Sequence, residues 1–186
     1  MPMLELNEVL LSGEERTLSL MAKARQLTCL VGATRQRRSR WLMAMLGLEP
    51  VQMGFISVDG EPLTPTTVGL LRPLMGYVPD RLQTEGEVVS YEPPTVQDVF
   101  RLRANRHLPI SNGILAEEMR RTGDSDADEA RRLAVAVLLG RPILLVDHPS
   151  AAVLPYLKDQ ARSGRTVIVA TDESAIINAA DLVVEI

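Results

Sequence analysis

The chain has 186 residues, of which 46% are hydrophobic and 24% are charged, which suits one folded α/β domain and argues against a disordered polymer. The formal net charge of -4 gives no reason to expect a dedicated nucleic-acid-binding protein. Cys29 is the only cysteine, and His107 and His148 are the only histidines, which excludes an intramolecular disulfide and argues against a zinc centre. Among the 20 basic residues only Lys23 and Lys158 are lysines, so any chemistry that needs a lysine must use one of them.

The N-terminal residues carry acids and no basic segment, which does not fit a secretory signal peptide. No stretch is long and uncharged enough to span a bilayer. We therefore expect a cytoplasmic protein.

The first half of the chain predicts strands interrupted by one helix. Apolar–polar alternation and short apolar runs predict strands over residues 4–10, 18–22, 27–32, 54–60 and 75–79. Between the third and the fourth, apolar residues at helical spacing over 41–48 predict a helix that ends near Gly47. Residues 81–97 are polar and contain two adjacent prolines, which indicates a surface loop.

The second half alternates helices with strands. Helices are expected over residues 95–105, 113–122, 129–139, 151–162 and 174–180, and strands over 143–147, 166–171 and 182–186. An Asp-rich loop over 124–128 precedes the third of these helices. This alternation implies a mostly parallel sheet with helices on both faces.

Several short segments, in this order, resemble landmarks of the nucleotide-binding domain of ABC transporters. They are Leu30-Val-Gly32 with Ser39, Gly47-Leu48, Asp59-Gly60, Gly76-Tyr-Val-Pro79, Arg131-Arg-Leu-Ala-Val-Ala136, Ile143-Leu-Leu-Val-Asp147, Pro149-Ser150 and Thr166-Val-Ile-Val-Ala-Thr171. The resemblance covers essentially the whole chain. It implies a P-loop NTPase-like α/β fold: a mostly parallel sheet with flanking helices, an N-terminal antiparallel β portion and a small helical insert. We therefore expect one such domain over residues 1–186, with 84–134 as a helical subdomain within it.

The phosphate loop departs from the family pattern. In G-x-x-x-x-G-K-[ST], backbone N–H groups surround phosphates, the lysine reaches the outer phosphates, and the hydroxyl holds magnesium. Here Gly32 and Ser39 match, whereas Arg37 takes the second glycine position and Arg38 the lysine position. Arg35 fills another place where the family uses a small residue. Each Cβ resists left-handed backbone at a cost of roughly 1 kcal/mol or more, and a planar guanidinium is no compact ammonium.

Neither of the two lysines can serve this loop, since Lys23 precedes the core strand and Lys158 lies far along the chain. Gly32, Arg37, Arg38 and Ser39 are the candidates for contacting a nucleotide, if one binds at all. We expect ATP and magnesium to bind weakly or not at all, and we predict no other cofactor and no metal site.

The positions that carry catalysis in the family differ as well. The resemblance places His148, directly after Asp147, where the catalytic glutamate is expected. It places Asp80 at the glutamine of the glutamine loop and Asp172 at the switch histidine. We therefore predict no catalytic residues, only these four degenerate counterparts.

The stretch that faces a partner's nucleotide is altered too. Ser125-Asp-Ala-Asp-Glu129 stands where the resemblance predicts Leu-Ser-Gly-Gly-Gln. In the family the glycines present N–H groups to a γ-phosphate, which the carboxylates of Asp126 and Asp128 would repel. Near Leu10-Leu11, where the family has an aromatic that stacks on adenine, there is none.

Two clusters allow a functional and a structural interpretation. The arginines of 35–40 could bind phosphate or nucleic acid, or could form an exposed basic loop at a helix N-terminus that pairs with acids of a partner. We favour the loop, because no aromatic residue interleaves with the arginines. Asp147 and His148 could be a general acid–base pair, or a strand end whose carboxylate caps a backbone group, which we favour. Cys29, on a buried strand, is expected to be inert.

The leading hypothesis is a catalytically degenerate ABC-type subunit, a pseudo-ATPase with a structural or regulatory role beside a membrane permease subunit or a second nucleotide-binding domain, as a homodimer or a heterodimer. The alternative is an ABC-transporter ATPase with residual ATP binding that acts only in a mixed dimer. A third, weaker hypothesis is an anion- or nucleic-acid-binding module that uses the 35–40 segment. The loop could also be collapsed and filled by its own arginines.

Overall fold

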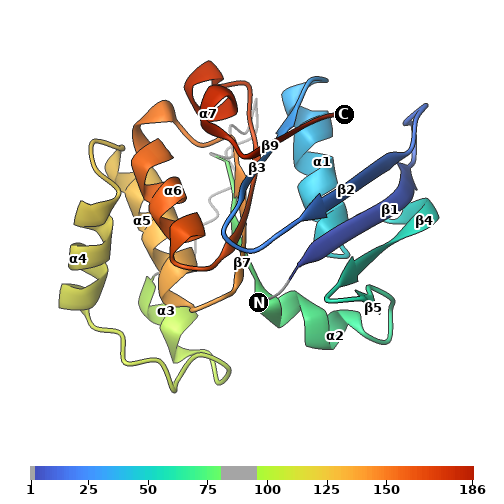
Figure 1. Cartoon of the computed structure of the whole chain (residues 1–186). Helices are drawn as coiled ribbons and strands as arrows, with labels where there is room; N and C mark the ends of the chain where they lie inside the picture. Colours follow the sequence, from blue (N-terminus) through green and yellow to red (C-terminus); the bar gives the residue numbers. More distant parts are fainter. Residues whose placement is uncertain (1–2, 81–95) are drawn as a thin grey trace, which may run out of the picture.

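The structure, a computed structural model, describes residues 3–80 and 96–186 and contains two sheets on either side of helix α1, Arg35–Met45 (Figure 1). Both sheets contribute to one hydrophobic core around this helix: Leu6 and Ile56 come from one sheet, and Leu145 and Ile168 come from the other. Helix α1 is therefore held from both sides, which fixes the loop that precedes it.

The first sheet is antiparallel, with the order β2-β1-β4-β5. Its strands are β1 (Leu4–Leu11), β2 (Leu18–Ala22), β4 (Val51–Val58) and β5 (Glu61–Pro62). Strand β4 begins at Val51, earlier than the predicted 54. Gly54 lies inside the strand at a register shift, with φ 78° and a position where a Cβ would come within 2.3 Å of the Asn7 carbonyl oxygen. Glu8 and Val9 of β1 lie opposite this single residue, so Gly54 faces a β-bulge of the neighbouring strand rather than starting its own strand.

The second sheet is parallel, with the order β6-β7-β8-β3-β9. Its strands are β6 (Met75–Val78), β7 (Ile143–Asp147), β8 (Thr166–Ala170), β3 (Leu27–Val31) and β9 (Leu182–Glu185). Successive side chains of the central strands face opposite layers: Leu145 packs toward α1, while Leu144 packs toward the helices of the other face. The predicted fold class, a mostly parallel sheet with flanking helices and an N-terminal antiparallel portion, is confirmed.

The remaining helices complete the layers (Figure 1). They are α2 (Val68–Leu71), α3 (Val96–Arg101), α4 (Asn112–Arg121), α5 (Ala127–Leu138), α6 (Leu154–Arg162) and α7 (Ser174–Ala179), with 3₁₀ turns over Arg72–Leu74 and Ala151–Val153. Helices α5, α6 and α7 share a core with the outer face of the parallel sheet, where Cys29 is also buried. Burial raises the pKa of the Cys29 thiol to about 12, as expected of an inert cysteine.

The differences from the predicted elements are local. Strand β5, helix α2 and the 3₁₀ turn over Arg72–Leu74 were not predicted, because such short segments carry no usable periodicity. The predicted helix over 151–162 consists of the 3₁₀ turn Ala151–Val153 followed by α6. Helix α3 ends at Arg101 rather than at 105. Residues 81–95, most of the predicted surface loop, lie outside the described residues, so the proposed subdomain over 84–134 stays a prediction.

Parallel strands end at one edge of their sheet, and loops at that edge gather side chains from distant parts of the chain. The segments that follow β3, β6, β7 and β8 carry all of the residues that the sequence singled out around the phosphate loop.

Candidate functional site

The loop before α1 is short, and the arginines belong to the helix. Gly32 and Ala33 have φ values of 79° and 51°, and the helix begins at Arg35. Thr34 caps it, because its hydroxyl accepts a hydrogen bond from the Arg37 N–H over 3.3 Å. The strain predicted for arginines in left-handed backbone is therefore wrong: Ala33 adopts that conformation, whereas the arginines are helical. The predicted loop over 35–40 is likewise a helical turn.

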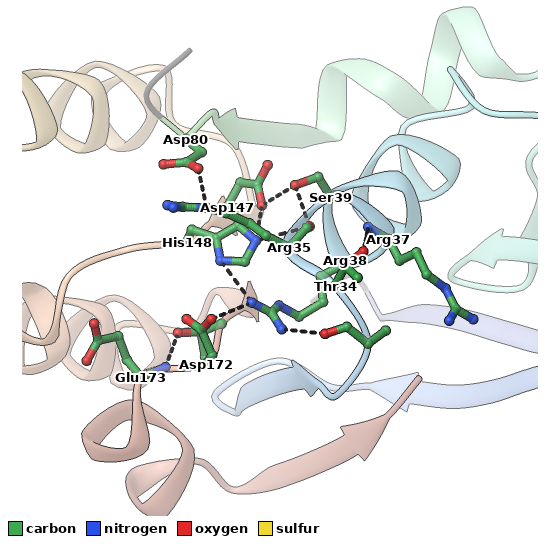
Figure 2. Close-up of polar contacts among 12 residues, drawn as sticks. Thr34, Arg35, Arg37, Arg38, Ser39, Asp80, Asp147, His148, Asp172 and Glu173 are labelled. Atoms are coloured by element: carbon green, nitrogen blue, oxygen red, sulfur yellow. Dashed lines mark hydrogen bonds and ion pairs between the residues drawn. The ribbon is translucent and has the colours of Figure 1, made fainter. Parts of the chain in front are cut away.

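The side chain of Arg38 lies inside the site, with 4% of its surface exposed. Its Nη1 donates to the carbonyl oxygens of Gly32 and Ala33 over 3.0 and 3.1 Å. Its Nη2 donates to Asp172 Oδ2 over 2.8 Å and lies 3.5 Å from Nδ1 of His148 (Figure 2). One guanidinium thus connects the phosphate loop with the segments after β7 and β8. The expectation that the loop is filled by its own arginine holds for this residue.

The other three arginines of this segment also have carboxylate partners. Arg35 pairs with Asp80 over 2.6 Å, Arg37 pairs with Glu14, and Arg40 pairs with Glu49 over 2.5 Å. Arg35 and Arg37 are exposed, as predicted, but each charge of this segment is matched by a carboxylate of the same chain. Asp80 and Asp172, the substitutes for the family's glutamine and histidine, are two of these partners.

The bond from Arg37 lowers the pKa of Glu14 from its ordinary value, and the nearby charges of Arg37 and Arg40 act in the same direction. For Asp172, partial burial acts to raise the pKa, but the hydrogen bond and the charge of Arg38 outweigh it, so the pKa lies below its ordinary value. Both carboxylates therefore stay ionised and paired near neutral pH.

Asp147 does not cap a backbone group, contrary to the favoured prediction. Its Oδ1 accepts a hydrogen bond from the Ser39 hydroxyl over 2.9 Å, and its Oδ2 accepts one from the Tyr77 hydroxyl over 3.0 Å. Burial raises the pKa of Asp147, and both hydrogen bonds oppose that rise. Burial and the adjacent Asp147 charge also raise the pKa of Tyr77 above its ordinary value. The two residues that keep the types expected for magnesium binding, Ser39 and Asp147, are thus in direct contact.

His148 is held by its neighbours and its backbone is unusual, with a φ of 48°. Its Nε2 lies 3.2 Å from the carbonyl oxygen of Arg35, which requires Nε2 to donate, so Nδ1 is the nitrogen that faces Arg38. Nε2 also lies 3.5 Å from Asp147. Burial lowers the pKa of His148, so the neutral ring is favoured.

In the segment 125–129, which the resemblance aligns with the family's signature, the carboxylates of residues 126, 128 and 129 also have partners within the chain. Asp126 caps α5, accepting hydrogen bonds from the N–H groups of Asp128 and Glu129 over 2.9 and 3.0 Å. The buried Glu129 carboxylate accepts from the N–H and the hydroxyl of Ser150 over 2.7 and 2.6 Å, and Asp128 pairs with Arg132. Helix α5 starts at Ala127 rather than at 129, because Asp126 is its cap, so the last two residues of the predicted acidic loop are helical.

The structure brings together seven of the residues chosen from the sequence: Gly32, Arg38, Ser39, Asp80, Asp147, His148 and Asp172. Arg37 points away, toward Glu14. Glu14 and Tyr77 were missed as site residues. Tyr77 could have been found, since strand alternation places it on the face opposite Val78 next to a strand that ends in Asp147. Nothing in the sequence indicates the approach of Glu14, which comes from the turn between β1 and β2.

Residues 3–80 and 96–186 contain neither a metal-ligating cluster nor a membrane-spanning helix. No group of three or more His, Cys, Asp or Glu residues there could hold a metal ion. Within the same ranges, no helix is long and apolar enough to cross a membrane.

Solved structures share this architecture. The two sheets, α1 and the loops at the carboxyl edge together have the fold of ABC-type ATP-binding subunits. An ATP-binding subunit of an ABC transporter superposes with a TM-score of 0.74 at 20% identity, over 99% of this chain and 85% of the other. The protein cbiO1 of Clostridium perfringens, part of the ABC transporter complex cbiONQ, superposes with a TM-score of 0.70 at 15% identity, over 98% of this chain and 83% of the other. At sequence identities of 20% and 15%, the similarity to these structures shows a shared fold alone.

Sequence comparison identifies relatives of the same class. An uncharacterized ABC transporter ATP-binding protein of Mycobacterium tuberculosis, found in strains CDC 1551 / Oshkosh and H37Rv, is 28% identical over 91% of this chain and 58% of its own length. The high-affinity branched-chain amino acid transport ATP-binding protein BraG of Pseudomonas aeruginosa is 25% identical over 77% of this chain and 65% of its own length. No protein-family model matches.

The predicted resemblance is thereby confirmed: the chain is related to the ATP-binding subunits of ABC transporters and has their fold. It spans less than two thirds of the length of these curated relatives.

Proposed function

We propose that this chain is a catalytically degenerate ABC-type subunit, a pseudo-ATPase with a structural or regulatory role in a transporter-type complex. Its partners would be a membrane permease subunit, a second nucleotide-binding domain, or both. It would lie in the cytoplasm and reach the membrane through them.

The observation that carries this proposal is the position of Arg38. A phosphate loop works when its backbone and one compact cation converge on phosphate oxygens. Here the guanidinium lies buried against the loop's own carbonyl oxygens at Gly32 and Ala33. The residues present therefore do not fit a magnesium–nucleotide complex, although Ser39 and Asp147 alone would suit magnesium.

The neighbouring positions support the same conclusion. His148, where the family has its catalytic glutamate, is buried, and its ring is bonded at Nε2 to the Arg35 carbonyl. Asp80 and Asp172 pair with arginines of α1. At the signature position, Asp126 occupies the N–H groups that would face a partner's nucleotide. We derive no hydrolytic step from this arrangement.

Calorimetric titration with millimolar Mg-ATP, combined with a phosphate-release assay, tests the proposal. We expect no saturable heat and no release above that of a Ser39→Ala variant, which removes the hydroxyl that would bind magnesium. Saturable binding with turnover in the wild type, abolished by Ser39→Ala, would overturn the proposal.

One observation favours the alternative of residual ATP binding in a mixed dimer. The Ser39 hydroxyl and the Asp147 carboxylate remain 2.9 Å apart, the kind of pair that coordinates magnesium. If this alternative holds, ATP raises the thermal midpoint of the wild type, and Arg38→Ala and Ser39→Ala both abolish the rise. A midpoint that is unchanged by every nucleotide would contradict it.

The hypothesis of an anion- or nucleic-acid-binding patch has no comparable support. Phosphate binding requires surplus positive charge, and each arginine of 35–40 has a carboxylate partner within the chain.

A further inference from the structure

The ion pair between Arg38 and Asp172 joins two groups of very different exposure. The side chain of Arg38 is 4% exposed and that of Asp172 is 73% exposed. A carboxylate at the surface loses little when it turns into solvent, whereas a buried guanidinium without an anion is strongly unfavourable. Arg38 therefore needs an anion, and Asp172 is the anion that the fold supplies.

The remaining partners of Arg38 are neutral. They are the carbonyl oxygens of Gly32 and Ala33 and the imidazole of His148. The other carboxylate at this edge, Asp147, is bonded to Ser39 and Tyr77. Within the described part of the chain, Asp172 is thus the carboxylate that neutralises this guanidinium.

The guanidinium of Arg38 also has one N–H donor that makes no hydrogen bond to the described residues. Its Nε is buried and has no hydrogen-bond partner among the described residues. It lies beside the N-terminus of α1, an 11-residue helix whose first turn carries partial positive charge. A guanidinium binds phosphate and carboxylate with the same geometry, so a phosphate and Asp172 would compete for it.

We propose that Asp172 is an internal latch: its carboxylate takes the place on Arg38 that a phosphate-class anion would take, and so keeps the phosphate loop closed to such anions. The latch rests on the proposed function, because it names what excludes phosphate from the same site. It differs from simple loss of the site, since the closed state depends on one exposed side chain.

The test compares Asp172→Ala with Glu173→Ala, a matched control that removes the same charge from the next, exposed residue. Both variants and the wild type are titrated with inorganic phosphate at constant ionic strength, and the thermal midpoint and the fluorescence of Trp41 are recorded. Trp41 is the only tryptophan and lies on α1 one turn beyond Arg38. Phosphate stabilises most proteins without saturation by its exclusion from their surfaces, so the control supplies the baseline.

We expect Asp172→Ala to bind phosphate saturably and at least about tenfold more tightly than the wild type or Glu173→Ala, because hydrogen bonds to charged groups are among the stronger ones. The Asp172→Glu variant should bind phosphate as weakly as the wild type, because its carboxylate can still pair with Arg38. ATP without magnesium should bind to Asp172→Ala as phosphate does, whereas adenosine should not, which separates the phosphate group from the base.

Two results would overturn the latch: no saturable response of Asp172→Ala beyond that of Glu173→Ala, or equal phosphate binding when Arg38→Gln is added to Asp172→Ala. These differ from the result that would overturn the proposed function, which is Mg-ATP binding with turnover by the wild type. If Asp172→Ala gains no phosphate affinity and the wild type does not respond to Mg-ATP, the latch alone is wrong.

Discussion

Truncation of Arg38 to alanine is expected to lower the free energy of unfolding by about 2–4 kcal/mol, because it removes a buried side chain and hydrogen bonds from a charged group. Those bonds connect α1 with Gly32, Ala33 and Asp172, which belong to segments far apart in the chain. Urea unfolding followed by circular dichroism measures the loss.

The matched control is Arg37→Ala. Arg37 is the neighbouring arginine, its side chain is 45% exposed, and it pairs with Glu14. Because Arg37 itself lies at the surface, we expect its truncation to lower the free energy of unfolding less than the truncation of Arg38 does. Arg38→Lys should fall between the two, because an ammonium keeps the charge but cannot span the carbonyls and Asp172 as a fork does. If Arg37→Ala and Arg38→Ala lower the free energy of unfolding equally, Arg38 does not hold the phosphate loop together.

Truncation of Glu129 to alanine is the second large effect that we expect, a loss of about 2–4 kcal/mol. The Glu129 side chain is buried and accepts two hydrogen bonds from Ser150. It joins the N-terminus of α5 to the segment after β7, and its removal leaves the Ser150 N–H without this acceptor. Hydrogen exchange should show faster opening of the first turn of α5, and urea unfolding gives the free energy.

Asp128→Ala is the control for this variant, since Asp128 carries the same charge one residue earlier, is 56% exposed and pairs within its helix with Arg132. We expect a loss below about 1 kcal/mol. Glu129→Gln should lose less than Glu129→Ala, because an amide oxygen still accepts one of the two bonds. A Glu129→Ala protein as stable as Asp128→Ala would contradict the assigned role.

The ion pairs between the arginines of α1 and nearby carboxylates give this site its particular chemistry. Where relatives in the family surround bound phosphate with glycine amides and a lysine, this chain has arginines at those positions and carboxylates at Asp80 and Asp172. The negative charge that a nucleotide would bring is supplied by the protein. Such a site gains fixed geometry from its ion pairs and needs no ligand to neutralise it, which is consistent with a structural or regulatory role.

Much of the fold could be predicted because its signals are local. The strand 143–147 is a continuous apolar run that ends in a carboxylate, and every residue of β7 is buried. The predicted element boundaries were wrong where a single residue sets them. Gly54 lies at a β-bulge rather than at a strand start, and Asp126 caps α5 rather than belonging to the loop before it. Hydrophobic periodicity in the sequence reveals neither the bulge nor the helix cap.

The composition and motif order by themselves determined the class of fold, the absence of a lysine from the phosphate loop, and the loss of the expected types at positions 80, 148 and 172. Only the tertiary structure decided where the charges go. Asp80 and Asp172 are separated from the arginines they bind by 45 and 134 positions, so no local pattern relates them. They meet because parallel strands end at one edge of a sheet, and each then pairs with an arginine of α1.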